Sequence, residues 1–265
     1  NTGKAIDEVN AKYTFSDLKE NAIDVNKEAK YVLCYAEATT RRNYDNADST
    51  FSFTLHPYAD KTTYFITFNP NIGQKKRIQE KTDNLTSFDT TITTSRDFVF
   101  HKRELINVME EGKLWVGENF SSTLTDVSIP ISLTNINNSY PCKMLMYVLS
   151  KSSSNTSYDV SINNSSLGNI PLAANSQDQI ARMAEFYKSF YLNDASNTIN
   201  LHFNPNVSAS QGWLNYILFN YTKSLNFNNN YLRFFSTDLW QENKTIKYVV
   251  SNVLSSSYQV WDVTN

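Results

Sequence analysis

The sequence is poor in cysteine, glycine, proline and histidine. Its 265 residues include two Cys, six Gly, six Pro and three His. Zinc sites need Cys or His ligands at close spacing, and phosphate-binding loops need several Gly residues between a strand and a helix. Neither pattern occurs, so the sequence predicts no metal site and no cofactor.

The two cysteines, Cys34 and Cys142, both lie in or beside apolar runs. Free cysteine is among the most buried residue types, so we expect two buried, unreactive thiols. A disulfide between them stays open, because pairing depends on distances that the sequence does not give. The chain is long enough to bury a core without such a crosslink.

The three histidines, His56, His101 and His202, each stand apart from the cysteines and from one another. A cysteine hydrolase needs a thiolate beside a His, with a third group that orients the His. The sequence therefore predicts no catalytic residues and no enzymatic activity for this chain. Paired carboxylates of a glycosidase type stay open, because any two acids can meet in space.

Long apolar runs and an excess of positive charge are also absent. No run of about 18 apolar residues occurs, so we expect no membrane span. The net charge is −2, and the 24 Lys and Arg are dispersed, which argues against a nucleic-acid partner. The chain begins at Asn1 without a Met, which suggests a trimmed mature form or a recombinantly expressed piece.

Aromatic residues are abundant, with 16 Tyr, 16 Phe and four Trp. This composition is typical of pleated strands. The four tryptophans, Trp115, Trp213, Trp240 and Trp261, could pack in a core or form a sugar-binding platform. Trp213 and Trp261 lie in alternating apolar runs and are expected in the core. Trp240 is the binding candidate for a glycan.

Short runs with period-two alternation, separated by polar turns, follow one another along the chain. They predict an all-β fold with two β-sandwich-type domains, of which the second is jelly-roll-like. We expect a first domain over 1–111, a second over 112–255, and a final strand or linker over 256–265. Apolar spacing over 102–112 predicts a short connecting helix. Residues 180–192 fit a helix or a strand, and we favour the strand.

Five segments together resemble one family. They are Tyr31-Val-Leu-Cys-Tyr-Ala-Glu, Tyr58-Ala-Asp-Lys-Thr-Thr-Tyr-Phe-Ile-Thr, Gly112-Lys-Leu-Trp-Val-Gly-Glu-Asn-Phe, Ser208-Ala-Ser-Gln-Gly-Trp-Leu-Asn-Tyr-Ile and Val260-Trp-Asp-Val-Thr. Similar segments occur in the same order in the region before the protease domain of PorU-type sortases, which belong to the gingipain-related peptidase family C25 of the Bacteroidetes. The signature residues carried by the resemblance are Trp115, Gly117, Glu118, Gly212, Trp213 and Trp261. Cys34 and Gln211 depart from it, standing where the family has an aromatic and a basic residue.

The resemblance implies a cell-surface or outer-membrane protein of the type IX secretion system. The family's peptidase removes C-terminal signals from secreted cargo, and it would lie after this chain. The implied role is a non-catalytic scaffold whose partners are its own downstream peptidase domain and other components of the attachment complex. It also implies a broad, partly apolar docking face. The alternative is a carbohydrate-binding sandwich at the bacterial surface.

Overall fold

The computed structural model describes residues 20–56, 59, 61–66, 75–82, 85–108, 114–176, 179–228, 231–235, 244–254 and 258–263. Within these ranges the regular structure consists of strands, as the all-β prediction required. The chain divides into two compact units. The smaller comprises Asn1–Asn43, Phe53–Ser87 and Ser255–Asn265, and the larger comprises Tyr44–Ser52 and Phe88–Leu254.

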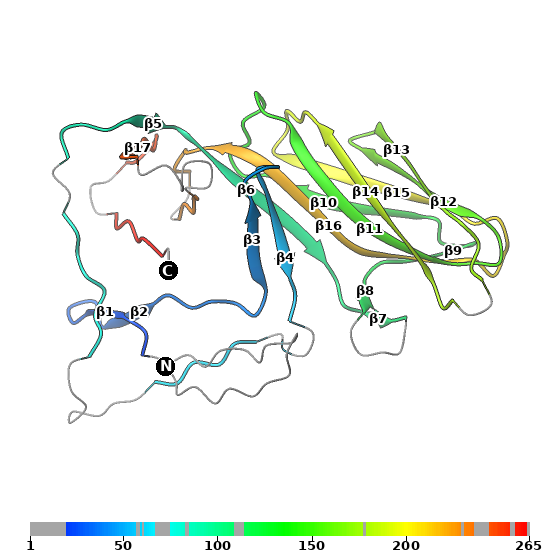
Figure 1. Ribbon diagram of the computed structural model, residues 1–265, viewed down its shortest axis with the longest axis horizontal. Helices are drawn as coiled ribbons and strands as arrows, with labels where there is room; N and C mark the ends of the chain where they lie inside the picture. The colour runs from blue at the N-terminus through cyan, green and yellow to red at the C-terminus, as the bar shows by residue number, and fades with distance from the viewer. Residues whose placement is uncertain are drawn as a thin grey trace. The chain divides into compact units, whose positions relative to one another are not determined.

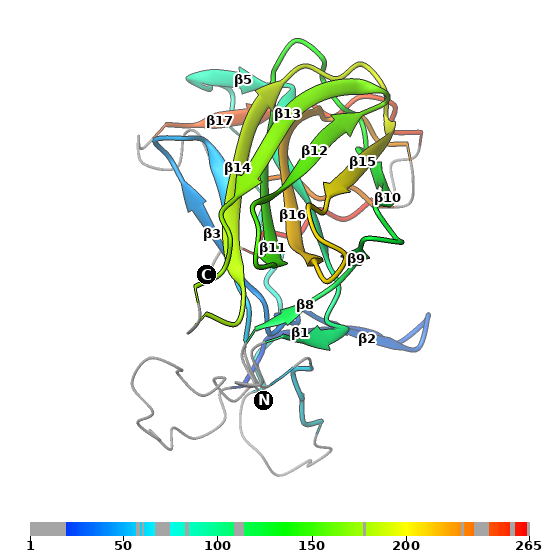
Figure 2. The ribbon, with the colours of Figure 1, turned by 90° about the vertical axis from the view of Figure 1, so that its right-hand side faces the viewer.

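The larger unit is a β-sandwich of two antiparallel sheets (Figures 1 and 2). One sheet has the order β10-β15-β12-β13. Its strands are β10 (Asp126–Ser132), β12 (Thr156–Ile162), β13 (Ser165–Leu172) and β15 (Ser196–Asn204). The other has the order β14-β11-β16-β6, and β9 also pairs with β16. Its strands are β6 (Thr94–Lys102), β9 (Asn119–Ser121), β11 (Cys142–Lys151), β14 (Arg182–Phe190) and β16 (Gln211–Ser224).

Short strand pairs complete the described structure. Antiparallel pairs are β1 (Ile23–Asn26) with β2 (Tyr31–Cys34) and β7 (Ile106–Asn107) with β8 (Trp115–Val116). Strand β3 (Arg41–Asp45) pairs with β4 (Thr50–Thr54). The strands β5 (Thr90–Ile92) and β17 (Ile246–Tyr248) pair in parallel. In the smaller unit, Ile23 also exchanges main-chain hydrogen bonds with Lys76 and Ile78, so the 76–78 segment lies beside β1.

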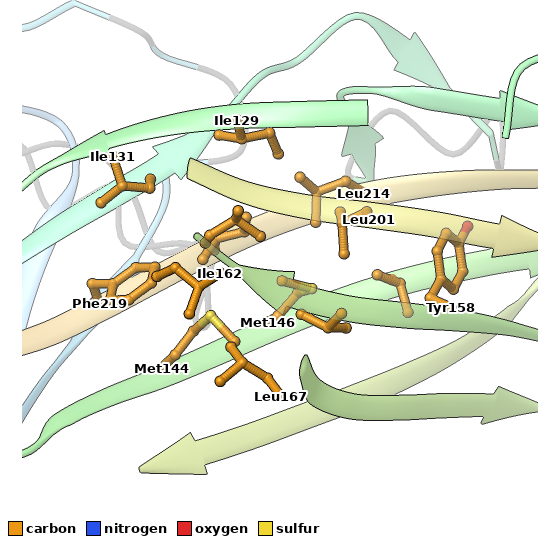
Figure 3. Packing of buried hydrophobic residues seen from close by; sticks show 14 of the residues in the cluster. Ile129, Ile131, Met144, Met146, Tyr158, Ile162, Leu167, Leu201, Leu214 and Phe219 are labelled. Atoms are coloured by element: carbon orange, nitrogen blue, oxygen red, sulfur yellow. The ribbon is translucent and has the colours of Figure 1, made fainter. Parts of the chain in front are cut away.

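The core lies between the two sheets of the sandwich, where alternate side chains of each strand meet. Figure 3 shows Ile129, Leu201 and Ile162 from one sheet facing Met146 and Phe219 from the other. Each such side chain contributes roughly 1.5–3 kcal/mol on burial. The β12–β13 turn shows how the chain manages with few Gly residues, because Asn163 and Asn164 supply its positive φ angles of 47° and 66°.

Several sequence expectations are decided by these elements. Within the 180–192 segment, Arg182–Phe190 form strand β14, as favoured from the sequence, which places Ala184, Phe186 and Phe190 against the core. The connecting helix over 102–112 is wrong in its described part, where β6 ends at Lys102 and β7 follows at Ile106. Of its described apolar residues, Val108 packs on the cluster of Val116, Leu149 and Trp213, whereas Leu105 and Ile106 are exposed.

The boundaries of the two compact units differ from those of the domains expected at 1–111, 112–255 and 256–265. Strand β6 belongs to the first of these ranges in sequence, yet it pairs along its whole length with β16 of the sandwich. The final segment, 256–265, was expected to be a strand or a linker, and its described part, 258–263, shows no strand pairing. Pairing across a sheet is a long-range property, so segment order alone does not reveal it.

Candidate functional site

Two of the family-like segments form one structural element in the sandwich. Strand β9 pairs with the start of β16, so that Phe120 lies opposite Gly212 and Asn119 lies opposite Trp213. The main-chain N–H of Gly117 donates to the carbonyl of Leu214 at 2.8 Å. The N–H of Leu214 in turn donates to the carbonyl of Glu118 at 2.9 Å. The Trp-Val-Gly-Glu and Gly-Trp-Leu segments thus hold each other in register.

Gly212 is required by close packing at this junction. A Cβ atom at this position would lie 2.0 Å from the hydroxyl oxygen of Tyr158 and 3.1 Å from the ring of Phe203. Tyr158 is fully buried, and its hydroxyl donates to the carbonyl of Leu149 at 2.8 Å. Because the tyrosine ring is fixed by this bond and by its aromatic neighbours, only glycine fits here.

Glu118 is the centre of a polar cluster at the same end of the sandwich. Its Oε1 lies 3.0 Å from Nε2 of His101 and 3.5 Å from a guanidinium nitrogen of Arg103. Its side chain is only 10% exposed. Burial raises the pKa of the Glu118 carboxyl, but the His101 bond, a main-chain bond and the charges of His101 and Arg103 together lower it below its usual value.

Lys102 is held beside this cluster by a β-bulge. The pairing of β11 with β16 shifts register after Tyr147, which leaves Asn215 as the extra residue. The Lys102 ammonium donates to Oδ1 of Asn215 at 2.8 Å and to the carbonyl of Trp115 at 2.7 Å. Burial lowers the pKa of Lys102, while the nearby Glu104 partly opposes the shift.

A second polar group, at the other end of β6 and β16, is a buried ion triad. Asp97 accepts from Lys223 at 2.6 Å and from Arg233 at 2.9 Å, and both Asp97 and Lys223 are buried. Arg233 also lies over the ring of Phe98, 4.8 Å from its centroid. The signal for this triad was present in the sequence, because Asp97 and Lys223 occupy core-facing positions of their strands.

The histidines and cysteines do not come together in the described residues. His202 pairs with Asp126 at 2.8 Å on the exposed face of the four-stranded sheet, and His56 accepts from the N–H of Ala59. Both cysteines are free thiols. Cys142 is buried as expected, but Cys34 is exposed, because β2 is part of a small strand pair and not of the core.

The structure also decides where most of the singled-out tryptophans lie. Trp213 is buried, as predicted. Trp115 is 38% exposed, and its carbonyl serves as an acceptor for Lys102. Trp261 was expected in the core but is half-exposed, and its indole N–H donates to Gln259 at 3.3 Å. Trp240, the glycan candidate, lies outside the described residues.

Other expectations concern metals and membranes. Across the described ranges, no three His, Cys, Asp or Glu side chains are grouped so as to hold a metal ion. Within the same ranges, no helix has the length and apolar character needed to cross a membrane.

The outer face of the five-stranded sheet carries an aromatic row. The hydroxyl of Tyr147 donates to Glu185 at 2.8 Å, and the rings of Tyr147 and Tyr216 lie 4.9 Å apart. On the same side of β14, Met183 and Tyr187 are both more than half exposed. This face therefore offers apolar surface together with a carboxylate acceptor.

Comparison with solved structures finds an extensive similarity. The crystal structure of dimeric latent PorU from Porphyromonas gingivalis matches with a TM-score of 0.65 and 17% identity. The match covers 85% of this chain and 22% of that chain, so this chain spans about a fifth of the PorU protein. The similarity establishes a PorU-like fold.

Two carbohydrate-binding modules give weaker matches. One is the CBM36-1 domain of a multidomain xylanase from the hindgut metagenome of Trinervitermes trinervoides, with a TM-score of 0.32, 13% identity, and coverage of 48% of this chain and 94% of that chain. The other is CBM36 in complex with calcium and xylotriose, with a TM-score of 0.32, 11% identity, and coverage of 48% and 99%. Scores this low carry no argument about function. No protein-family model matches the chain, and no curated protein matches it significantly.

Proposed function

We propose that this chain is the non-catalytic scaffold and partner-docking region of a cell-surface cysteine peptidase of the PorU type. The observation that supports this most is the fold match to PorU, which extends over 85% of this chain and covers 22% of that chain. The peptidase would process C-terminal signals of secreted cargo, and its catalytic residues would lie downstream of this chain. The chain itself would have no catalytic activity.

The packing of the signature residues adds physical support. Gly117, Glu118, Gly212 and Trp213 meet at one junction of strands, although about a hundred residues separate the two segments in sequence. The junction depends on a glycine without room for a Cβ and on a carboxylate whose side chain is 10% exposed. This junction would serve as structural support for the docking surface and not as an active site.

The docking surface that we assign to the peptidase domain lies on the outer side of β14. Met183 and Tyr187 expose large apolar area there, and Ile180 and Tyr191 at the ends of the strand are also exposed. A large exposed apolar patch on a protein often marks an interaction site, whereas single scattered apolar residues do not. An apolar patch of this kind fits the broad, partly apolar docking face expected from the resemblance.

The test begins with the gene. A reading frame that continues past residue 265 into a domain with a Cys/His pair is expected, and a gene that ends without one contradicts the proposal. The downstream domain is then expressed separately and titrated with the 265-residue chain. Tyr187→Ser is expected to weaken its binding about tenfold, as for loss of an aromatic anchor. Tyr231→Ser, at a tyrosine outside β14 that is exposed to a greater extent, serves as the control and is expected to bind as the wild type.

A second candidate function is glycan binding on the same face. Tyr147, Tyr187 and Tyr216 supply rings, and Glu185 supplies a hydrogen-bond acceptor, which are the groups that sugars require. A glycan array separates the two candidates. Saturable binding to a defined saccharide that is lost in Tyr187→Ala favours this candidate. An array without signal, together with binding of the downstream domain, excludes it.

A further inference from the structure

The two sheets of the sandwich end at strands β10, β13, β6 and β14. An edge strand presents unpaired main-chain N–H and C=O groups, and natural proteins obstruct such edges with Pro, with charge or with a covering segment. Strand β10 contains Pro130 and β13 contains Pro171, neither of which has an N–H to donate. The 233–235 segment covers part of β6, where the N–H of Phe235 donates to the hydroxyl of Ser95 at 2.9 Å. These three edges are therefore poor sites for a further strand.

Strand β14 is an open edge. It pairs with β11 along its whole length and, in the described part of the chain, with no other strand (Figure 2). Its sequence contains no Pro. In an antiparallel pair, alternate residues direct their N–H and C=O groups away from the partner strand, so a row of such groups lies along the free side of β14. A strand of another polypeptide can pair with this row.

Lys188 restricts which strand can be added on the inner side of the sheet. Ala184 and Phe186 of β14 pack against the core, and Lys188 belongs to the same alternating set of side chains. Lys188 lies opposite Met144, which is fully buried, yet Lys188 itself is exposed at the edge. An inward-pointing charge on an edge strand opposes unselective pairing, because an added strand would remove the ammonium from water. A strand that pairs here therefore needs a carboxylate opposite Lys188.

Glu185 sets a matching requirement on the outer side. It lies between Met183 and Tyr187, whose side chains are 56% and 52% exposed. Its carboxylate accepts a hydrogen bond from the hydroxyl of Tyr147, which lies opposite it on β11. Opposite charges that face each other across a strand pair are stabilising, and like charges are destabilising. The added strand therefore needs a basic residue opposite Glu185, with apolar residues on either side along the same face.

The edge of β14 in a second copy of this chain does not meet these requirements. In a two-fold symmetric, antiparallel pair of β14 strands, residues that lie opposite each other share one face of the sheet. Even-numbered positions then meet even-numbered positions, and odd-numbered positions meet odd-numbered ones. Lys188 would face Arg182, Ala184, Phe186, Lys188 or Phe190, and Glu185 would face Met183, Glu185, Tyr187 or Ser189. No register places an acid opposite Lys188 or a base opposite Glu185, so the charges favour a different polypeptide.

We propose that the free edge of β14 binds an extended segment of another polypeptide by antiparallel strand addition, with an acidic residue opposite Lys188 and a basic residue opposite Glu185. Main-chain hydrogen bonds supply the affinity in this mode of binding, and the side chains that alternate along the strand supply the selectivity. The inference goes beyond the proposed function, because the segment bonds to the main chain of β14 and not to the outer surface assigned to the peptidase domain. It does not require that the peptidase domain docks.

The experiment titrates the ¹⁵N-labelled 265-residue chain with two synthetic peptides of identical composition. The matched peptide, Thr-Ser-Glu-Val-Ile-Lys-Val-Tyr-Thr, places its Glu opposite Lys188 and its Lys opposite Glu185 when its Ile lies opposite Phe186 in an antiparallel pair. The swapped peptide, Thr-Ser-Lys-Val-Ile-Glu-Val-Tyr-Thr, exchanges the two charges. We expect the matched peptide to bind with a Kd of roughly 100 μM and the swapped peptide to bind about tenfold more weakly.

Amide hydrogen exchange distinguishes strand addition from binding to a face of the sheet. At a matched-peptide concentration of ten times the Kd, the β14 amides on the free side are expected to exchange roughly tenfold more slowly, while those at the edge of β10 are unchanged. Failure of the matched peptide to saturate by roughly 2 mM overturns the proposal. Binding without added protection in β14, or equal Kd values for the two peptides, also overturns it.

Charge variants of the chain test the two residues. The double variant Glu185→Lys/Lys188→Glu is expected to reverse the preference and bind the swapped peptide about tenfold more tightly than the matched one. The double variant Glu185→Asp/Lys188→Arg keeps both charges and is the control that is expected to retain the wild-type preference. Both residues are exposed, and thermal unfolding confirms that each variant is folded. An unchanged preference in the charge-reversed variant overturns the assignment. Sedimentation of the chain alone tests the other occupant, since a dimer that the charge reversal abolishes would assign this edge to a second copy and overturn the proposal.

Discussion

Replacing Gly212 by alanine tests the packing of the junction between β9 and β16. The added methyl group would lie 2.0 Å from the hydroxyl oxygen of Tyr158, a separation at which one of the two must move. Tyr158 is fully buried and has ring contacts with Phe120 and Phe203 at 5.2 Å and 4.9 Å. The phenol therefore cannot swing away without disturbing the core.

The cost has two parts. Overpacking of a well-packed core costs about 1–3 kcal/mol. Displacing the Tyr158 hydroxyl leaves the carbonyl of Leu149 buried without this donor, which costs about 1–3 kcal/mol more. We expect Gly212→Ala to lower the free energy of unfolding by about 3 kcal/mol, which corresponds to roughly 6–12 °C in Tm for a unit of this size.

Urea denaturation monitored by tryptophan fluorescence measures this change, and Gln211→Ala at the exposed neighbouring position is the control. Combining Gly212→Ala with Tyr158→Phe removes the clashing oxygen. The double variant is then expected to be more stable, by about 1 kcal/mol or more, than the sum of the two single effects predicts. The reasoning is refuted if Gly212→Ala unfolds within about 0.5 kcal/mol of the wild type.

Three further predictions follow from buried groups. Asp97→Asn leaves Lys223 buried without its carboxylate and is expected to cost about 3 kcal/mol in thermal or urea unfolding, and a wild-type Tm contradicts the triad. The lowered pKa of Glu118 adds stability at neutral pH, and this stability is lost as the pH falls below 4.5, the ordinary pKa of a Glu carboxyl. Glu118→Gln is therefore expected to flatten the pH dependence of the unfolding free energy in that range. Identical acid unfolding profiles for the variant and the wild type reject this. A thiol reagent is expected to modify Cys34 in the native protein but Cys142 only after unfolding, because burial raises the pKa of Cys142 to about 11. Rapid modification of both thiols in the native protein would contradict this.

Local pattern predicted the strands that bury one face or both faces. The alternation through Val127, Ile129 and Ile131 became β10, and the continuous apolar run from Trp213 to Tyr221 became part of β16, the central strand of its sheet. The helix pattern failed at 102–112, where Leu105 and Ile106 are exposed and Val108 packs on a local cluster. At 258–263 the apolar alternation is not accompanied by strand pairing. Alternation reports a buried face, but it does not report the partner that buries it.

The sequence by itself determined the all-β class, the positions of most strands, and the absence of Cys/His and Gly-rich motifs, because these depend on residue type and local period. Only the tertiary structure decided that β6 belongs to the sandwich, that Glu118 meets His101, and that β14 lies at the edge of its sheet. These relations join residues that lie far apart in sequence through strand register. The tertiary structure also explains why glycine is required at position 212, because a Cβ atom there would lie 2.0 Å from the hydroxyl oxygen of Tyr158.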